Sequence, residues 1–460
     1  MSDISTIAAL ATAPAPAGVA IIRVSGPKTK SLLSQIFRAR KNPADYPREL
    51  VFGEILDFQS GEVLDRALAV YMPSPASYTG EDIAEFQLHG SPVLIQKVLR
   101  SLFALGVDPA QPGEFTKRAF LNGKLDLSQA EALCDLISAT SERALMIAKE
   151  QLEGALSKEL AQIGESLRDA LAELEAGLDF PEEDINPKRL TELAQALSAS
   201  SAALSTLLST CEYGKHLREG YHVLLCGPPN AGKSSLLNLL LGRDRAIVTP
   251  ISGTTRDLIE EELLLDGYKF VFCDSAGIRE TTDEVERIGI ELAESKIAWA
   301  DLVFLVVDAQ SNQSDVRRAI EAAHTKSKRI WLVVNKIDLP TPSTKELPSE
   351  AKSCARVFSI SVKSNAGVTQ LRTALIEELK GSLPTQAESS FIVSSQRQVR
   401  CLTRAKDSLV RACEGIQQRL SPELPSAEIR HALSALEELI GKTYTEDILS
   451  RIFSKFCIGK

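Results

Sequence analysis

The sequence predicts a multidomain protein with an α+β domain first, an α-helical domain after it, and an α/β domain inserted into the helical one. Three observations lead to this prediction. Short apolar runs between Gly and Pro breaks fill residues 1–121, a seam of leucines at helical spacing follows, and a glycine-rich loop in mid-chain stands between a predicted strand and a predicted helix.

The first domain, residues 1–121, is predicted to mix strands and helices. Its apolar runs are short and bounded by Gly, Pro or polar residues, which is typical of strands, at 19–24, 51–58, 67–72 and 83–88. Residues 93–102 instead show the spacing of a helix. Together these patterns indicate an α+β domain.

The helical domain is predicted in two parts, residues 122–217 and 383–460. Ser128 and Glu131 have the spacing of a capping box at the start of a long helical region. One continuous apolar seam then runs along a helix that needs partners, through Leu152, Leu156, Leu160, Ile163, Leu167, Leu171, Leu174 and Leu178. The tail is too short for its own core, so we expect it to pack on the first part. Residues 218–382 would then be an insertion whose ends lie close together.

Residues 227–234, GPPNAGKS, fit the phosphate-loop pattern G-x-x-x-x-G-K-[ST]. A predicted strand at 221–226 precedes the loop and a predicted helix at 235–241 follows it, which is the context that the motif requires. Backbone N–H groups and the helix N-terminus would bind a polyphosphate. Lys233 would pair with its β- and γ-oxygens, and the Ser234 hydroxyl would hold Mg²⁺. These flanks disfavour the alternative of a chance glycine-rich turn.

Asn335-Lys336-Ile337-Asp338 predicts that the nucleotide is GTP. The motif follows the apolar run 330–334, at the C-terminal end of a predicted strand, where open α/β sheets bind ligands. The Asp338 carboxylate can accept both N1–H and N2–H of guanine, a donor pair that adenine lacks, and the Lys336 stem can lie flat on the base. The segment Ser361-Val362-Lys363 resembles a weaker S-A-K element that supports the base.

Two further elements complete the pattern of a Ras-like P-loop G domain. Asp274 and Gly277 match D-x-x-G, whose Asp reaches Mg²⁺ through water and whose Gly N–H meets the γ-phosphate. Residues 253–257, GTTRD, offer a Thr hydroxyl that completes the Mg²⁺ shell only while the γ-phosphate is present. Ile278 stands where Ras-like GTPases carry a Gln that orients the attacking water. The acidic residues of the cluster 283–286 are the candidates for that role. Asp283 and Glu284 are more simply solvated charges.

Composition limits the other possibilities. A net charge of −9 argues against a non-specific nucleic-acid binder, so any RNA contact must be local or shared with a partner. The eight cysteines, without a C-x-x-C pair or a secretory signal, indicate reduced thiols. No apolar run has the length of a transmembrane helix. We therefore expect a cytoplasmic protein with no membrane association.

Asn230 inside the phosphate loop, the segment 246–257 and Ile278 resemble the Era/Der/MnmE group of bacterial GTPases. Three blocks narrow this resemblance to the MnmE (TrmE) family over the whole chain: residues 6–10 with 19–26, residues 112–124, and the terminal 456–460, FCIGK. The chain departs from the family pattern at Ser275, where Thr is usual, at Ser91 in HGS, and at 13–19, which lacks the usual Gly-rich sequence.

The resemblance implies a K⁺-activated GTPase. By position, Asn230, Thr249, Ile251 and Thr254 match K⁺ ligands, Thr255 matches an Mg²⁺ ligand together with Ser234, and Glu286 matches the residue that orients water. The ion would supply the charge that an arginine finger gives elsewhere. The implied GTP-binding residues are Asn230, Ala231, Gly232, Lys233, Ser234, Ser235, Thr249, Thr254, Thr255, Asp274, Gly277, Asn335, Lys336, Asp338, Ser361 and Lys363.

The resemblance also implies that the first domain binds 5-formyl- or 5,10-methylene-tetrahydrofolate and forms a homodimer. The matching folate-contacting positions are Arg23, Glu85, Lys124 and Lys460. Basic groups suit the glutamyl carboxylates of a folate, and a Glu suits the N–H pair of its pterin. Cys457 would lie near the one-carbon chemistry as nucleophile or acid. The alternatives are an inert buried thiol or a prenylation box, for which a terminal Lys is atypical.

The family would pair with an FAD-dependent MnmG-type protein in a heterotetramer. Together they would add an aminomethyl or carboxymethylaminomethyl group at C5 of the wobble uridine of certain tRNAs. Two other hypotheses remain open at this stage. One is a ribosome-assembly GTPase switch of the Era or Der type, although the chain shows neither a KH signature nor a second set of G motifs. The other is a dimeric scaffold without a folate site, which folate titration would discriminate.

Overall fold

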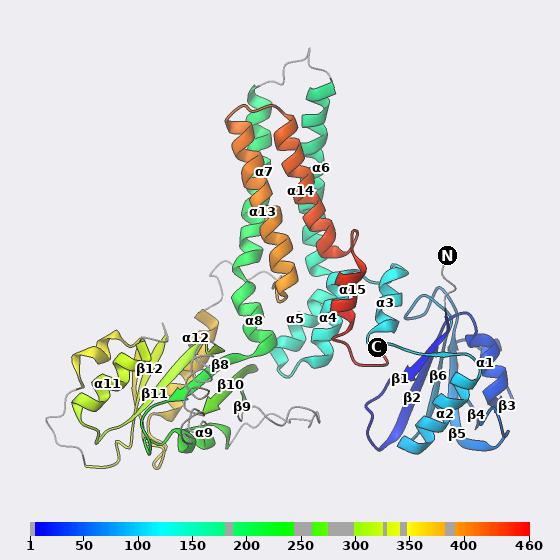
Figure 1. Ribbon diagram of the computed structural model, residues 1–460, viewed down its shortest axis with the longest axis horizontal. Helices are drawn as coiled ribbons and strands as arrows, with labels where there is room; N and C mark the ends of the chain where they lie inside the picture. The colour runs from blue at the N-terminus through cyan, green and yellow to red at the C-terminus, as the bar shows by residue number, and fades with distance from the viewer. Residues whose placement is uncertain are drawn as a thin grey trace, which may run out of the picture. The chain divides into compact units, whose positions relative to one another are not determined.

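The structure is a computed structural model that describes residues 5–179, 187–242, 260–274, 299–324, 329–340, 347–381 and 392–460 (Figure 1). The chain divides into two compact units. The first joins the N-terminal region to the end of the chain and comprises Met1–Cys134, Gln151–Leu160 and Leu433–Lys460. The second comprises Asp135–Glu150 and Ala161–Ala432.

The N-terminal region of the first unit is built on a seven-stranded sheet in the order β3-β4-β5-β6-β2-β1-β7. The strands are β1 (Ile7–Leu10), β2 (Ala17–Ser25), β3 (Phe37–Ala39), β4 (Val51–Leu56), β5 (Val63–Met72), β6 (Ile83–Gly90) and β7 (Asp108–Pro109). All neighbours are antiparallel except β1 and β7. Helices α1 (Thr29–Ile36) and α2 (Pro92–Ala104) pack on one face through Leu33, Ile36, Val98 and Leu102.

The end of the chain returns to this unit. Helices α3 (Glu114–Leu121) and α4 (Leu127–Ser138) meet α15 (Glu446–Phe453) in one apolar cluster of Phe120, Leu127, Leu449, Phe453 and Phe456. The backbone N–H of Phe115 donates to the carbonyl of Lys460 at 3.2 Å. The last residue is therefore held against the start of α3.

The helical region also contains α5 (Glu142–Leu152), α6 (Ala155–Asp179), α7 (Pro187–Ser209), α8 (Cys211–Glu219), α13 (Gln396–Gln417) and α14 (Glu423–Ile440) (Figure 1). Helix α13, from the tail of the chain, packs along α7. Its start is fixed by a capping box in which the Ser395 side chain accepts from the N–H of Gln398.

Two local predictions about the helical region were wrong. The cap of α4 is not formed by Ser128 and Glu131: Asp126 accepts from the Gln129 N–H at 2.9 Å, and the Gln129 side chain accepts from the Asp126 N–H at 2.9 Å. The leucine seam does not follow one helix either. Gly154, at φ +82°, separates α5 from α6. The four-residue spacing from Leu152 to Leu156 crosses that turn, so the leucine pattern does not show the break.

The second unit contains a six-stranded sheet in the order β13-β12-β11-β8-β10-β9, parallel throughout except for β9. The strands are β8 (Tyr221–Cys226), β9 (Glu260–Leu265), β10 (Tyr268–Asp274), β11 (Leu302–Asp308), β12 (Ile330–Asn335) and β13 (Arg356–Ser359). Helices α9 (Lys233–Leu241) and α12 (Val368–Gly381) cover one face, and α11 (Gln313–His324) lies on the other.

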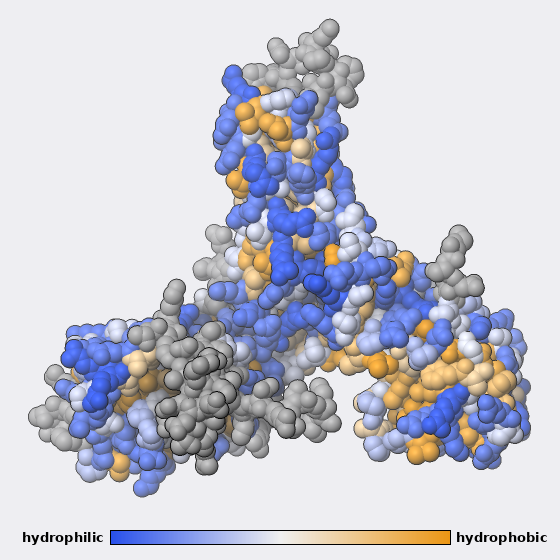
Figure 2. Space-filling view, in the orientation of Figure 1, coloured by the Kyte–Doolittle hydropathy of each residue, from blue (hydrophilic) through white to orange (hydrophobic). Residues whose placement is uncertain are grey.

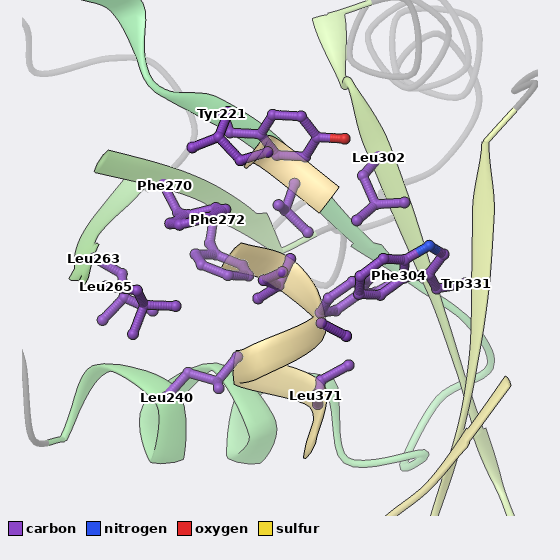
Figure 3. Close-up of a cluster of buried hydrophobic side chains, with 14 of the residues drawn as sticks. Tyr221, Leu240, Leu263, Leu265, Phe270, Phe272, Leu302, Phe304, Trp331 and Leu371 are labelled. Carbon is purple, nitrogen blue, oxygen red and sulfur yellow. The ribbon is translucent and has the colours of Figure 1, made fainter. Parts of the chain in front are cut away.

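The core on the first of these faces is aromatic. Phe270, Phe272, Phe304 and Trp331 project toward Leu240 of α9 and Leu371 of α12 (Figure 3). The rings of Phe304 and Trp331 stack with centroids 5.5 Å apart. Burial on both faces explains why these strands are continuous apolar runs. The two sheets and the helical region agree with the predicted fold class. Within the described parts of the chain, no helix is both long and apolar enough to span a bilayer.

Candidate nucleotide-binding site and a second charged site

The phosphate loop connects β8 to α9 in the way that the sequence predicts. Gly227 has φ +137°, and a Cβ there would lie 2.0 Å from the carbonyl oxygen of Val306. Gly232 has φ +95°, and its Cβ would lie 2.2 Å from the Asn335 side-chain nitrogen. Only glycine fits these two positions. Asn230 also takes a left-handed conformation, at φ +61°, which Asn tolerates better than most residues.

Lys233 is the first residue of α9 and is 8% exposed. Its ammonium donates to the carbonyl oxygens of Gly227 and Pro228, at 2.8 and 3.0 Å. The loop therefore encloses a buried cation at a helix N-terminus, where the unpaired N–H groups also attract anions. Of the neighbouring predicted contacts, Ala231 is buried and Ser235 is exposed.

Ser234 and Asp274 supply a pair of oxygens suited to Mg²⁺. Ser234 lies in α9, after β8, and Asp274 ends the parallel neighbour β10; the Ser234 hydroxyl donates to the Asp274 carboxylate at 2.6 Å. A hydroxyl and a carboxylate are the hard ligands that Mg²⁺ takes beside phosphate oxygens. The other predicted cation ligands and switch residues lie outside the described residues: Thr249, Ile251, Thr254, Thr255, Gly277 and Glu286.

Asn335 joins the base-recognition segments to the phosphate loop. It is 2% exposed, its side-chain N–H donates to the Ala231 carbonyl at 3.0 Å, and its side-chain oxygen accepts from the Val362 N–H at 3.2 Å. The Ser361 hydroxyl donates to the Asp338 carboxylate at 2.6 Å. Lys363 is exposed. The structure thus brings three separated motifs together at the carboxyl edge of the sheet.

Lys336 has a partner that the sequence did not predict. Its ammonium pairs with the Asp308 carboxylate at 2.7 Å. Asp308 ends β11 as Asn335 ends β12, and the two residues are direct register partners. The apolar run before Asp308 indicates a strand end at that position, but only the strand order places it beside the N-K-x-D motif.

A second charged site lies on the other face of the N-terminal sheet. Ile22 and Val24 point toward α1 and α2, so Arg23 between them points to the opposite face. Its register partner is Glu85 on β6, and the Arg23 guanidinium donates to the Glu85 carboxylate at 2.8 Å. Each side chain is only 16% exposed.

Aromatic rings and the chain terminus surround this ion pair. The Arg23 guanidinium lies 5.4 Å from the ring centre of Tyr78 and 5.7 Å from that of Phe115. Burial lowers the pKa of the Lys460 ammonium, and the nearby Arg23 charge lowers it further. Sequence analysis missed Tyr78, which has no periodic signal. It also missed Phe115, although this residue lies within the block 112–124.

Two further residues predicted for this site are Lys124 and Cys457. Lys124 is exposed, and its stem lies beside Gly80, in the same loop as Tyr78. Cys457 is exposed, and its carbonyl accepts from the Lys460 N–H at 3.3 Å. The structure therefore brings Arg23, Glu85 and Lys460 together.

Two family models match this chain. One, described as the GTP-binding protein TrmE N-terminus, matches residues 6–124, and the other, described as the MnmE helical domain, matches residues 127–457. The chain belongs to the MnmE (TrmE) family. As a member of this family it is a GTPase, which confirms the family and the enzyme class predicted from the motifs.

The relatives are similar over the full length. The tRNA modification GTPase MnmE of Syntrophotalea carbinolica is 42% identical over 464 residues, covering 100% of each chain. That of Akkermansia muciniphila is 41% identical over 456 residues, covering 99% of each. A solved structure of Aquifex aeolicus Era, bound to GDP and AlF4⁻, covers 41% of this chain and 66% of its own at 25% identity. The TM-score of this match is only 0.28, so the family assignment depends on the sequence comparisons and not on this structure.

Proposed function

We propose that this chain is a K⁺-dependent GTPase that serves modification at C5 of the wobble uridine of certain tRNAs. It would act with an FAD-dependent MnmG-type partner in a heterotetramer. The observation that carries the proposal is that one chain of this family brings Asn335 against the phosphate loop and also pairs the partly buried Arg23 and Glu85 near Lys460.

In the nucleotide site, Lys233 would turn from the loop carbonyls to the β- and γ-phosphate oxygens of GTP. Ser234 and Thr255 would hold Mg²⁺ directly and Asp274 would reach it through water, and Asn230, Thr249, Ile251 and Thr254 would hold K⁺. The two cations would supply positive charge where negative charge develops on the transferred phosphoryl group. Glu286 would orient the attacking water, because Ile278 has no polar atom with which to do so.

In the second site, the chemistry fits a reduced folate. The Glu85 carboxylate would accept from the N–H pair of a pterin, and Arg23, Lys124 and Lys460 would attract the glutamyl carboxylates. Tyr78 and Phe115 add flat apolar surface next to Arg23. The bound 5-formyl- or 5,10-methylene-tetrahydrofolate would supply the carbon of the modification.

The proposed homodimer would form through the N-terminal domain. Large apolar side chains are exposed there, and Figure 2 shows hydrophobic surface on this domain. Phe52 on β4 is 64% exposed, and Val93 on α2 is 67% exposed. Apolar surface of this kind is typical of interfaces when it is contiguous.

The test of the GTPase mechanism is hydrolysis at equal ionic strength in K⁺ and in Na⁺, for the unmodified chain, Glu286→Ala and the neighbouring control Glu284→Ala. We expect K⁺ to raise the rate about tenfold or more, Glu286→Ala to lower it about 100-fold, and Glu284→Ala to change little. A rate indifferent to the ion and to Glu286→Ala would refute the mechanism.

We also propose that Cys457 acts as nucleophile or acid in the one-carbon chemistry. Testing this role requires the complete modification reaction. The chain, its FAD-dependent partner, tRNA, GTP and the folate are incubated, and the modified uridine is measured by mass spectrometry. Cys457→Ser should lose the modification while GTP hydrolysis persists. Full modification by this variant would remove Cys457 from the chemistry.

A further inference from the structure

Each polar member of the 335–338 motif is held by a residue outside it. Asn335 bonds to Ala231 and Val362, and Asp338 accepts from Ser361. Those partners belong to the phosphate loop and to the segment 361–363, which the sequence already assigns to GTP binding. The partner of Lys336 is Asp308, which belongs to no nucleotide-binding motif.

Asp308 is placed for this contact by the sheet. It is the register partner of Asn335, and the Ala309 N–H donates to the Asn335 carbonyl at 2.8 Å. One oxygen of the Asp308 carboxylate accepts from the Gln310 N–H at 2.8 Å, and the other pairs with Lys336 at 2.7 Å. The carboxylate is therefore fixed to the backbone before it pairs with the lysine.

Lys336 requires such an anchor. Its backbone is left-handed, at φ +67°, and its side chain is 34% exposed. A lysine stem that must lie flat on a base loses rotational freedom when it is ordered, and this loss opposes binding. An ion pair at the Lys336 ammonium already orders the side chain in the folded protein. The loss of rotational freedom is then part of folding and no longer opposes nucleotide binding.

We propose that Asp308 is a positioning residue for guanine, because it holds the Lys336 ammonium so that the stem forms one wall of the base slot. The inference rests on the proposed contact between Lys336 and the base. A purely structural ion pair between partly exposed side chains would contribute little to folding and nothing specific to nucleotide binding.

The test uses Asp308→Asn, which keeps an acceptor for the Gln310 N–H and removes the charge. The dissociation constant and dissociation rate of a fluorescent GDP are measured, with KM and kcat for GTP. We expect the dissociation constant and KM to rise about five- to tenfold, mainly through faster dissociation, with kcat nearly unchanged. Asp266→Asn is the matched control, because it removes an Asp–Lys pair with Lys380, 3.0 Å long, in the same domain.

A double-mutant cycle separates positioning from other effects. Lys336→Met keeps an apolar stem without the charge, so Asp308→Asn in that background should change the dissociation constant less than twofold. Asp308→Glu should bind GDP more tightly than Asp308→Asn, because it restores the charge. Unchanged GDP binding by Asp308→Asn, or an equal effect with and without Lys336, would overturn the inference. Failure of the unmodified chain to bind GDP would instead refute the proposed guanine site.

Discussion

The nucleotide site and the Arg23 site are assembled in different ways. In the nucleotide site, each chemical task belongs to a short contiguous motif, and the parallel sheet needs only to bring the ends of its strands together. In the N-terminal site, Arg23 and Glu85 lie 62 residues apart, and Lys460 comes from the end of the chain. Sheet register and the return of the tail create that site.

This difference determines what the sequence reveals. A contiguous loop carries its glycines, lysine and hydroxyl at fixed spacing, so its chemistry is visible before folding. An antiparallel register pair carries no such spacing, and Arg23 or Glu85 alone has the appearance of a surface charge. The family resemblance, and not the residues alone, led to the second site.

The largest expected effect tests the nucleotide site. Asp338→Asn replaces one acceptor for guanine by an amide N–H₂, which opposes the N–H groups of guanine and suits the C2 carbonyl of xanthine. We expect GTP affinity to fall about 1,000-fold and xanthosine triphosphate to become the preferred ligand. Competition of the two nucleotides for a fluorescent GDP measures this switch. Unaltered preference for GTP would remove Asp338 from base recognition.

The second largest expected effect tests the N-terminal site around Arg23 and Glu85. Arg23→Gln leaves the partly buried Glu85 without its cation, so the affinity for 5-formyltetrahydrofolate should fall about 30-fold while GDP binding is unchanged. Arg38→Gln is the matched control. Arg38 pairs with Glu54 across neighbouring strands of the same sheet, but its side chain is 60% exposed. Equal loss in both variants, or no folate binding by the unmodified chain, would favour the scaffold hypothesis.

A smaller effect tests whether every long-range charge cluster is a ligand site. At the start of β11, His216 from α8 and His222 from β8 approach the Asp301 carboxylate at 3.3 and 3.4 Å, and the His222 N–H donates to it at 2.9 Å. Burial alone would raise the pKa of Asp301, but these hydrogen bonds outweigh burial and hold it well below its ordinary value of 3.8. We assign this cluster to stability.

Because the folded-state pKa is depressed, the stabilisation is present above pH 3.8 and is lost as the pH falls below that value. Asp301→Asn should therefore lower the free energy of unfolding by about 1 kcal/mol near neutral pH and by less near pH 3. Both tryptophans of the chain lie in this domain, Trp331 within β12 and Trp299 against the ring of His222, so their fluorescence in urea follows this domain. A difference that does not depend on pH would contradict the assignment. Asp315→Asn, on an exposed helical pair, is the control.

The sequence predicted most strands that carry a long apolar run, although it left out the run at β11 (Leu302–Asp308). Strands β2, β4, β5, β6, β8 and β12 match predicted runs, whereas β1, β3 and β7 are too short to show a period. The break at Gly154 was hidden because leucine spacing continues across it. The Lys336–Asp308 pair depends on which strands are neighbours, which no local pattern contains. The roles of Glu286 and the K⁺ ligands remain predictions.

The central claim is that one chain holds two separate sites, one for a guanine nucleotide and one for a reduced folate. Calorimetric titration with GDP and with 5-formyltetrahydrofolate tests it on the unmodified chain, on Lys233→Ala and on Arg23→Gln. We predict that the unmodified chain binds both ligands, that Lys233→Ala loses GDP binding alone, and that Arg23→Gln weakens folate binding alone. Loss of both ligands through either substitution, or no folate binding by the unmodified chain, would contradict the claim.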